Sequence, residues 1–210
     1  MKIAIIDCGA GNLHSVRKAF VRQMPQDAQL EIVTDAAALA DATHIVLPGV
    51  GAFADCMNGL NALPGMRAAL EEKVLRGSTP FFGICVGMQM LFERGYEHGV
   101  HEGLGWFKGE VKRIHPTDPA LRVPHMGWNR LHLQHRHALF EGIKNGDYVY
   151  FVHSYAATGM NPEELLASVD YGGQIVALIG RKNIVASQFH PEKSQRAGLA
   201  MIGNFLTRGA

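Results

Sequence analysis

The sequence predicts an α/β protein with a mostly parallel central sheet flanked by helices, followed by a β-rich second half. Apolar, β-branched runs alternate with amphipathic stretches up to Gly95, a pattern typical of a parallel sheet covered on both faces. Beyond Gly95 short strand-like runs follow one another closely. Hydrophobic residues make up 47% of the 210 residues. This content is enough for a buried core, so we expect one domain over residues 1–210.

The first half is expected to open with a buried strand, residues 2–6, that ends in the glycine-rich turn Gly9-Ala10-Gly11. Asn12 can cap a helix that runs to about Met24, because asparagine is favoured just before the first helical turn. The remaining elements are expected in this order: strand 31–33, a short helix capped at Thr34-Asp35, strand 44–47, the loop 48–51, helical stretches 54–60 and 65–76, strand 80–84 and helix 86–92.

The second half is expected to contain mainly strands. We predict them at 106–114, 130–133, 148–152 and 167–169. Runs 174–179 and 184–189 should pair as a hairpin across residues 180–183, since a short polar segment with glycine separates two apolar runs. A final helix at 194–207 closes the chain, and no internal repeat or linker interrupts it.

Composition excludes several classes of function. The formal net charge is +1 and there is no basic run, so we expect no nucleic-acid partner. No apolar run reaches membrane-spanning length and no cleavable leader is visible, so we expect a cytoplasmic protein with no membrane partner. The three cysteines form no Cys-x-x-Cys pair, and no His-x-x-x-His or Glu-x-x-His pattern lies on a predicted helix. We therefore predict no metal.

Cys85 is the strongest candidate for a catalytic residue. It is the centre of Gly83-Ile84-Cys85-Val86-Gly87, where an apolar strand meets a helix. This is the form of a nucleophile elbow, whose glycines relieve clashes in a tight turn. A cysteine at a helix N-terminus is favoured as a thiolate, and the Val86 N–H can face an oxyanion formed on attack. The other two cysteines are interpreted as buried core residues: Cys8 and Cys56.

His190 and Glu192 are the candidate base and its orienting carboxylate. They follow the apolar run 184–189 and are separated by Pro191. Residues two apart in an extended segment project to the same side, so the imidazole and carboxylate can meet. Such a contact fixes the histidine tautomer and stabilises the imidazolium. A further cluster of histidines is interpreted as a solvated face: His132, His135 and His137.

With these residues the sequence resembles the class I glutamine amidotransferases, which use a Cys-His-Glu triad. The segments GICVGMQ at 83–89 and HPE at 190–192 match the two hallmark segments of that family. Met88 before Gln89 resembles the histidine-biosynthesis branch. So do further blocks of the sequence: DCGAGNL at 7–13, PGVGAF at 48–53, PHMGWN at 124–129 and YFVHSY at 150–155.

The resemblance implies a flavodoxin-like core, hydrolysis of glutamine to glutamate and ammonia without a cofactor, and transfer of ammonia to a (β/α)₈-barrel cyclase subunit. It assigns glutamine binding to four residues: Gln89, His153, Ser154 and Tyr155. It adds Val50 and Gly51 to the oxyanion hole beside Val86. It assigns the partner interface to Asn12, His125, Trp128 and Lys193.

Alternatives stay open at this stage. Trp128 can equally be a core tryptophan, and Lys193 can be a solvated surface lysine. The chain can belong to another triad branch, of the anthranilate, aminodeoxychorismate or pyridoxal-phosphate type. It can also be a cysteine peptidase with the same elbow, or a scaffolding subunit that has kept the fold.

Overall fold

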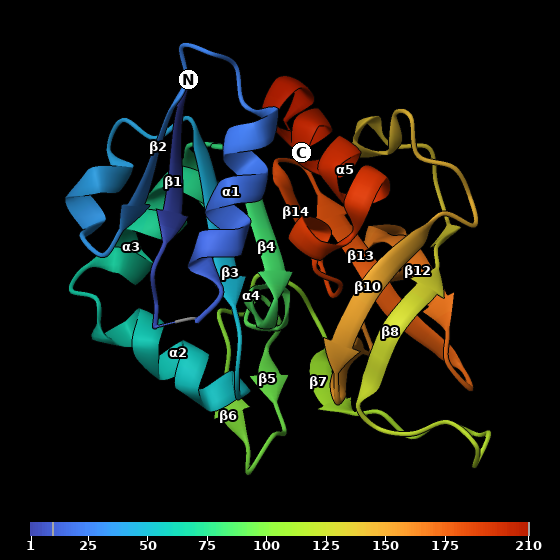
Figure 1. Ribbon diagram of the computed structural model, residues 1–210. Helices are drawn as coiled ribbons and strands as arrows, with labels where there is room; N and C mark the ends of the chain where they lie inside the picture. Colours follow the sequence, from blue (N-terminus) through green and yellow to red (C-terminus); the bar gives the residue numbers. More distant parts are fainter. Residues whose placement is uncertain (10, 210) are drawn as a thin grey trace.

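An eight-stranded sheet forms the centre of the molecule in the computed structural model, which describes residues 1–9 and 11–209 (Figure 1). Its strand order is β2-β1-β3-β4-β14-β13-β12-β9. The strands, in chain order, are β1 Lys2–Ile6, β2 Gln29–Val33, β3 His44–Gly49, β4 Phe81–Cys85, β9 His132–Leu133, β12 Leu165–Asp170, β13 Gln174–Arg181 and β14 Ile184–Ser187. The first five strands of this order pair in parallel, and the other three add antiparallel pairs.

Two smaller sheets lie beside the central one, as the β-rich second half predicts. Strands β8 and β10 form an antiparallel ribbon, and β11, β7, β5 and β6 form the other sheet. Their bounds are β5 Arg94–Gly95, β6 His101–Glu102, β7 Glu110–Arg113, β8 His125–Arg130, β10 Tyr148–His153 and β11 Tyr155–Thr158. The predicted fold class is therefore confirmed.

The helices cover the central sheet. They are α1 Leu13–Gln23, α2 Phe53–Ala62, α3 Met66–Leu70, α4 Val86–Gln89 and α5 Gln195–Arg208, with short helical turns at Ala36–Leu39, Glu71–Arg76, Ala138–Phe140, Pro162–Glu164 and Pro191–Lys193. Helices α1 and α5 pack against each other, with the rings of Phe20 and Phe205 in edge contact at 6.4 Å. Phe205 also lies 5.2 Å from the ring of Phe82 in β4. These aromatic side chains attach both helices to the sheet.

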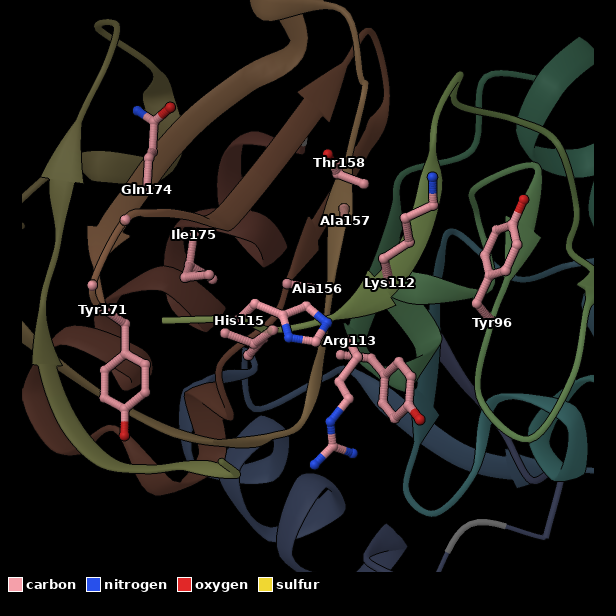
Figure 2. A pocket seen from close by; sticks show the side chains of 14 residues that line it. Tyr96, Lys112, Arg113, His115, Ala156, Ala157, Thr158, Tyr171, Gln174 and Ile175 are labelled. Atoms are coloured by element: carbon pink, nitrogen blue, oxygen red, sulfur yellow. The ribbon is translucent and has the colours of Figure 1, made fainter. Parts of the chain in front are cut away.

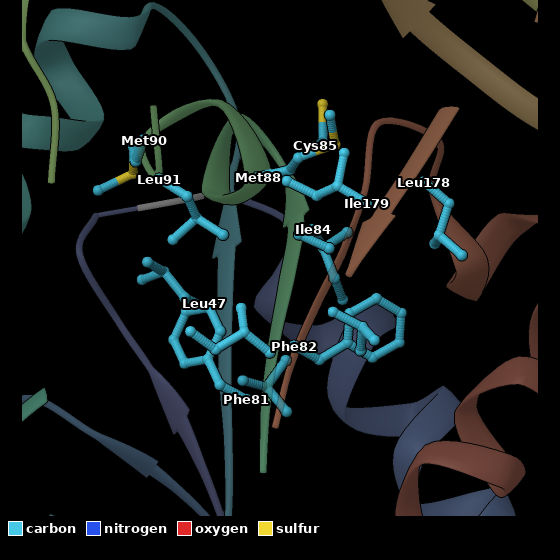
Figure 3. Packing of buried hydrophobic residues seen from close by; sticks show 14 of the residues in the cluster. Leu47, Phe81, Phe82, Ile84, Cys85, Met88, Met90, Leu91, Leu178 and Ile179 are labelled. Carbon is cyan, nitrogen blue, oxygen red and sulfur yellow. The ribbon is translucent and has the colours of Figure 1, made fainter. Parts of the chain in front are cut away.

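The core is continuous around β3, β4 and β13. Figure 3 shows Leu47, Phe82 and Ile179 as members of this one buried cluster, with Cys85 at the end of β4. Phe82 and Ile179 are fully buried. Because β1, β3, β4 and β14 are parallel, their carboxyl ends lie at one edge of the sheet, where α/β proteins place their ligands. The candidate nucleophile is therefore on the edge expected for a site.

Several local predictions were wrong. The predicted helix 86–92 ends at Gln89, since the next carbonyls, those of Met90, Leu91 and Phe92, accept hydrogen bonds from the loop 104–107. The predicted strand 106–114 is only β7, and 130–133 divides between β8 and β9. Asn12 stands before α1 but makes no side-chain cap. Ala10, in the middle of the predicted glycine-rich turn, lies outside the described residues.

The hairpin prediction is confirmed. Strands β13 and β14 pair antiparallel, with Arg181 opposite Ile184, so Lys182 and Asn183 form the turn. The predicted cap at Asp35 is also present, because its carboxylate accepts a hydrogen bond from Ala37 N at 2.9 Å. In the described part of the chain no helix has the length and apolarity needed to cross a bilayer.

Candidate active site

Cys85 occupies a strained turn between β4 and α4. Its φ is 56°, a left-handed value that non-glycine residues seldom adopt. This is the geometry of a nucleophile elbow. Gly49 at the end of β3 pairs with Cys85, so the loop that follows β3 begins beside the thiol. The turn therefore brings the sulfur, the Val86 N–H and the 50–51 loop to one place.

Cys85 opens into a cavity of about 320 Å³. The cavity is lined by the residues Val50, Gly51, Cys85, Val86, Gln89, Glu97, Pro124, Val152, His153, Ser154, Tyr155 and His190. All seven residues predicted to form the oxyanion hole or to bind substrate are among them. The structure thus gathers around one cavity residues from six separate parts of the sequence.

His190 and Glu192 make the contact predicted from the sequence. His190 Nδ1 lies 2.8 Å from Glu192 Oε1, and the two side chains are 3% and 0% exposed. The geometry behind it differs from the prediction, because Pro191–Lys193 is a helical turn rather than an extended segment. The His190 backbone is held by its N–H, which donates to the Tyr150 carbonyl of β10 at 3.0 Å.

The pKa of His190 is raised to about 9. Burial by itself lowers this pKa, but the hydrogen-bonding interactions with Cys85 and Glu192 outweigh it. His190 is therefore an imidazolium at neutral pH, held by a carboxylate on one side and facing the thiol on the other. By contrast, burial raises the pKa of the Cys8 thiol to about 11 and that of Cys56 to about 12. Both cysteines are buried in the core, as predicted.

Asn12 contacts the candidate triad residue Glu192. Its Nδ2 donates to Glu192 Oε1 at 2.7 Å, across 180 positions of sequence. Glu192 Oε1 thus accepts hydrogen bonds from both Asn12 and His190, while Oε2 is buried without a hydrogen-bond partner within the described residues. The predicted interface role of Asn12 stays a prediction, and its amide is already engaged inside this chain.

The other three predicted interface residues differ in exposure. Trp128 is 44% exposed, which excludes the core interpretation, and its ring meets Tyr150 edge-on at 5.8 Å. Lys193 is exposed, with Nζ 5.7 Å from the centre of the Tyr150 ring. His125 is only 2% exposed. The predicted interface role of His125 stays a prediction, and its side chain is buried within this chain.

Two residues were missed by the sequence analysis. Gln188 is fully buried, accepts from Gln89 Nε2 at 3.0 Å, and places its own Nε2 3.9 Å from Cys85 Sγ. A glutamine at the end of an apolar strand was the available signal. Glu97 lines the cavity, and one of its oxygens accepts from Phe53 N at 3.0 Å. Nothing in its local sequence marks Glu97, because only the fold brings it there.

A second cavity, of about 620 Å³, lies next to the first and shares Tyr155 with it. Figure 2 shows that Lys112, Arg113 and His115 line it. Lys112 is paired with Glu110 at 2.6 Å. This cavity contains no cysteine, so the cavity at Cys85 is the candidate active site. Across residues 1–9 and 11–209 no cluster of three or more potential metal ligands occurs.

Two buried histidines near the site should make the free energy of unfolding depend on pH. Burial lowers the pKa of His153 to about 3 and that of His125 to about 4. Below pH 6.5 the unfolded chain therefore binds two protons that the folded chain does not, and stability falls. From pH 7 to 5.5 we expect a loss of about 2 kcal/mol in the free energy of unfolding, measurable by urea titration at each pH.

The pKa of His190 is shifted in the opposite direction. Its contribution to the free energy of unfolding is therefore present below pH 6.5 and is lost as pH rises towards 9. Stability should therefore peak near pH 6.5. Replacing His153 with glutamine should reduce the acid slope, and replacing the exposed His135 with glutamine should leave it unchanged. Equal stability at pH 7 and 5.5 in the unmodified chain would contradict the neutral burial of both histidines.

The chain belongs to the class I glutamine amidotransferase family, whose model matches residues 4–208. Its fold agrees with this, since a solved glutamine amidotransferase superposes with a TM-score of 0.69 at 19% identity, covering 96% of this chain and 98% of the other. More specific relatives are imidazole glycerol phosphate synthase subunits HisH. Those of Brucella abortus and Rhodospirillum rubrum are 51% and 52% identical, over 98% of both chains in each pair. These comparisons set aside the other triad branches and the peptidase alternative.

Proposed function

We propose that this chain is the glutaminase subunit of an imidazole glycerol phosphate synthase. It hydrolyses glutamine to glutamate and ammonia, and it passes the ammonia to a (β/α)₈-barrel cyclase subunit in histidine biosynthesis. Full-length relatives of this name support the proposal. The observation that carries it is the elbow cysteine in a cavity beside an imidazolium held by a buried carboxylate. Residues 1–210 then act as one amidotransferase domain.

The catalytic cycle follows from the placement of three groups. Cys85 attacks the carboxamide carbon as a thiolate, which the imidazolium of His190 favours. The Val86 N–H, at the start of α4, stabilises the oxyanion. His190 then donates its proton to the departing nitrogen, and ammonia leaves with formation of a thioester. With His190 as base, water attacks the thioester carbon, and glutamate and the free thiol are released. Glu192 holds the imidazole in place.

The loop after β3 supplies a second oxyanion donor in this proposal. Val50 O accepts from Cys56 Sγ at 3.6 Å, so the N–H of Gly51 points the opposite way in the same trans peptide. Gly51 has a φ of 108°. Only glycine adopts this value readily, so its conformation, and not a lack of space, requires glycine here.

We assign Glu97 to the amino-acid end of glutamine and Gln89 to its side-chain amide. The cavity contains one carboxylate, that of Glu97, which can pair with the α-ammonium group. Ser154 and Tyr155 add polar groups to the same wall. This set explains selection of a free amino acid, because a peptide-bound glutamine lacks the ammonium.

The exposed face of the β8–β10 ribbon is the surface that we assign to the cyclase subunit. Met126, Trp128 and Tyr148 are 61%, 44% and 47% exposed on it, and β8 and β10 are paired so that Trp128 is opposite Tyr150. Exposed aromatic and methionine side chains are typical of interface centres. Lys193, next to the triad residue Glu192, extends this face towards the active site.

The decisive experiment measures glutamate release from glutamine by the chain alone and with a purified cyclase subunit. We expect the cyclase subunit to raise the rate, and we expect ammonia to be incorporated into the cyclase product without equilibrating with added ammonium. Complementation of a histidine auxotroph should succeed. Glutamate release with no response to the cyclase subunit, together with failed complementation, would overturn the proposal in favour of another amidotransferase.

A further inference from the structure

A chain of polar side chains, half-buried at Asn129 and buried at His125 and His153, connects strand β8 to the cavity. Asn129 Nδ2 lies 3.2 Å from His125 Nε2, and His125 Nδ1 lies 3.0 Å from His153 Nε2. His153 Nδ1 lies 2.8 Å from the Tyr155 carbonyl oxygen. The two histidines are 2% and 6% exposed. Because buried polar groups have to be paired, one consistent arrangement of protons must satisfy all three contacts.

The carbonyl of Tyr155 fixes that arrangement. A carbonyl only accepts, so His153 donates from Nδ1, and as a neutral ring it accepts at Nε2. His125 must then donate from Nδ1 and accept at Nε2 from the Asn129 amide nitrogen. Asn129 is itself fixed, since its oxygen accepts from Arg130 N at 2.7 Å and its nitrogen also donates to Asp170 O at 2.9 Å. Each histidine is therefore neutral and held in one tautomer.

Packing holds the middle of the chain in place. The His125 ring is stacked between Tyr171 and Phe151, with ring centres 4.0 and 4.6 Å away. Gly127, between His125 and Asn129 in β8, has a φ of 126°, which residues with side chains rarely adopt. The unusual backbone at Gly127 lies where the two side chains, four positions apart, approach within hydrogen-bond distance.

At the cavity end the chain reaches Gln89. The Tyr155 carbonyl accepts a second hydrogen bond, from Gln89 Nε2 at 3.0 Å, and Gln89 Nε2 also donates to Gln188 at 3.0 Å. Both N–H bonds of the Gln89 amide are thus used. Its oxygen has no donor among the described residues, and it is not one of their buried unpaired atoms. The oxygen therefore faces the cavity as an acceptor.

We propose that Asn129, His125 and His153 are positioning residues for glutamine. Through the Tyr155 carbonyl they hold the Gln89 amide in the orientation that presents its oxygen to the ligand. The substrate offers matching donors, its ammonium and its carboxamide NH₂. This inference rests on the proposed function and changes the role of His153, whose ring nitrogens are both occupied, from a direct ligand to a positioning residue.

The test measures calorimetric Kd values for L-glutamine in Cys85→Ala chains, where no turnover occurs. His125→Phe keeps the ring between Tyr171 and Phe151 but removes the donor to His153, and we expect the Kd to rise about tenfold. Gln89→Met should weaken binding further. In the Gln89→Met background, His125→Phe should have no additional effect, because the chain then has no amide left to orient.

A second variant and a spectroscopic measurement separate positioning from folding. Asn129→Asp has the same shape but only accepts, so it reverses the proton direction at His125 and should raise the Kd as His125→Phe does. Ring ¹⁵N shifts should show His153 as the Nδ1–H tautomer in the parent and as a mixture in both variants. This tautomer readout decides the question even if His125→Phe folds poorly.

The outcomes distinguish this inference from the proposed function. Absence of glutamine binding by the Cys85→Ala parent would overturn both. An unchanged Kd in folded His125→Phe and Asn129→Asp chains would overturn the positioning role alone. So would equal effects of His125→Phe in the presence and absence of Gln89, since His125 would then act only by stabilising the fold.

Discussion

Replacing Cys85 with serine is expected to lower cyclase-stimulated glutamate release by a factor of about 10⁴ or more, comparable to removal of a nucleophile in other triad enzymes. A serine hydroxyl stays protonated beside an imidazolium, whereas the imidazolium favours a thiolate on cysteine. The pKa of His190, raised to about 9, makes the site suited to sulfur and not to oxygen. Glutamine Kd should change little, because Cys85 is one of many cavity residues.

Cys8→Ser is the matched control for this substitution. Burial raises the pKa of the Cys8 thiol to about 11, and its sulfur contacts only the Pro48 carbonyl, at 3.6 Å, among the hydrogen bonds of the described residues. The rate should stay within about threefold. An electrophilic glutamine analogue should modify Cys85 alone, as mass spectrometry can show. A Cys85→Ser rate within tenfold of the unmodified chain would exclude Cys85 as the nucleophile.

The candidate catalytic residues could be identified from the sequence because each group lies in a short segment. Gly83 to Gly87 contains the whole elbow, and His190 and Glu192 are two residues apart. The contact between His190 and Glu192 was predicted correctly, although the extended backbone assumed for it was wrong, since Pro191 starts a helical turn. A two-residue separation allows the contact in either conformation, so the prediction did not depend on the geometry assumed.

Roles that depend on distant contacts could not be predicted in the same way. The sequence predicts Asn12 as a helix cap, but its amide donates to Glu192, because α1 packs against the helical turn Pro191–Lys193. The family resemblance assigns both His125 and Trp128 to the partner interface. The alternation of β8 instead turns His125 inward and Trp128 outward, and only a correct strand assignment at 125–130 would have shown this.

The fold class was predictable because hydrophobic periodicity identifies the parallel strands of the first half. Element ends were less predictable where tertiary contacts replace regular structure. Residues 90–92 are fully buried and apolar, which favours a longer helix, yet their carbonyls accept from the 104–107 loop. Trp106 and Phe107 read as strand residues by composition, but they belong to that loop and pack into the core instead of joining β7.

Gly87→Ala is expected to lower the free energy of unfolding by about 4 kcal/mol or more, a size that indicates steric conflict in the core. An added Cβ would lie 1.9 Å from the carbonyl oxygen of Leu47. The Cβ is fixed to the backbone of α4 and the oxygen belongs to the backbone of β3, so neither can move without separating the elbow from the neighbouring strand. Denaturant unfolding monitored by circular dichroism would measure the loss.

Gly203→Ala provides the control in the same chain. Its added Cβ would come within 3.2 Å only of the end of the Gln23 side chain, which can move. Alanine is also the better helix former within α5, so stability should change by no more than about 1 kcal/mol in either direction. If Gly87→Ala were as mild as this control, the close approach of β3 and α4 would be wrong, and with it the placement of the 50–51 loop beside Cys85. The stability of Gly87→Ala thus tests the geometry of the proposed oxyanion hole independently of any activity measurement.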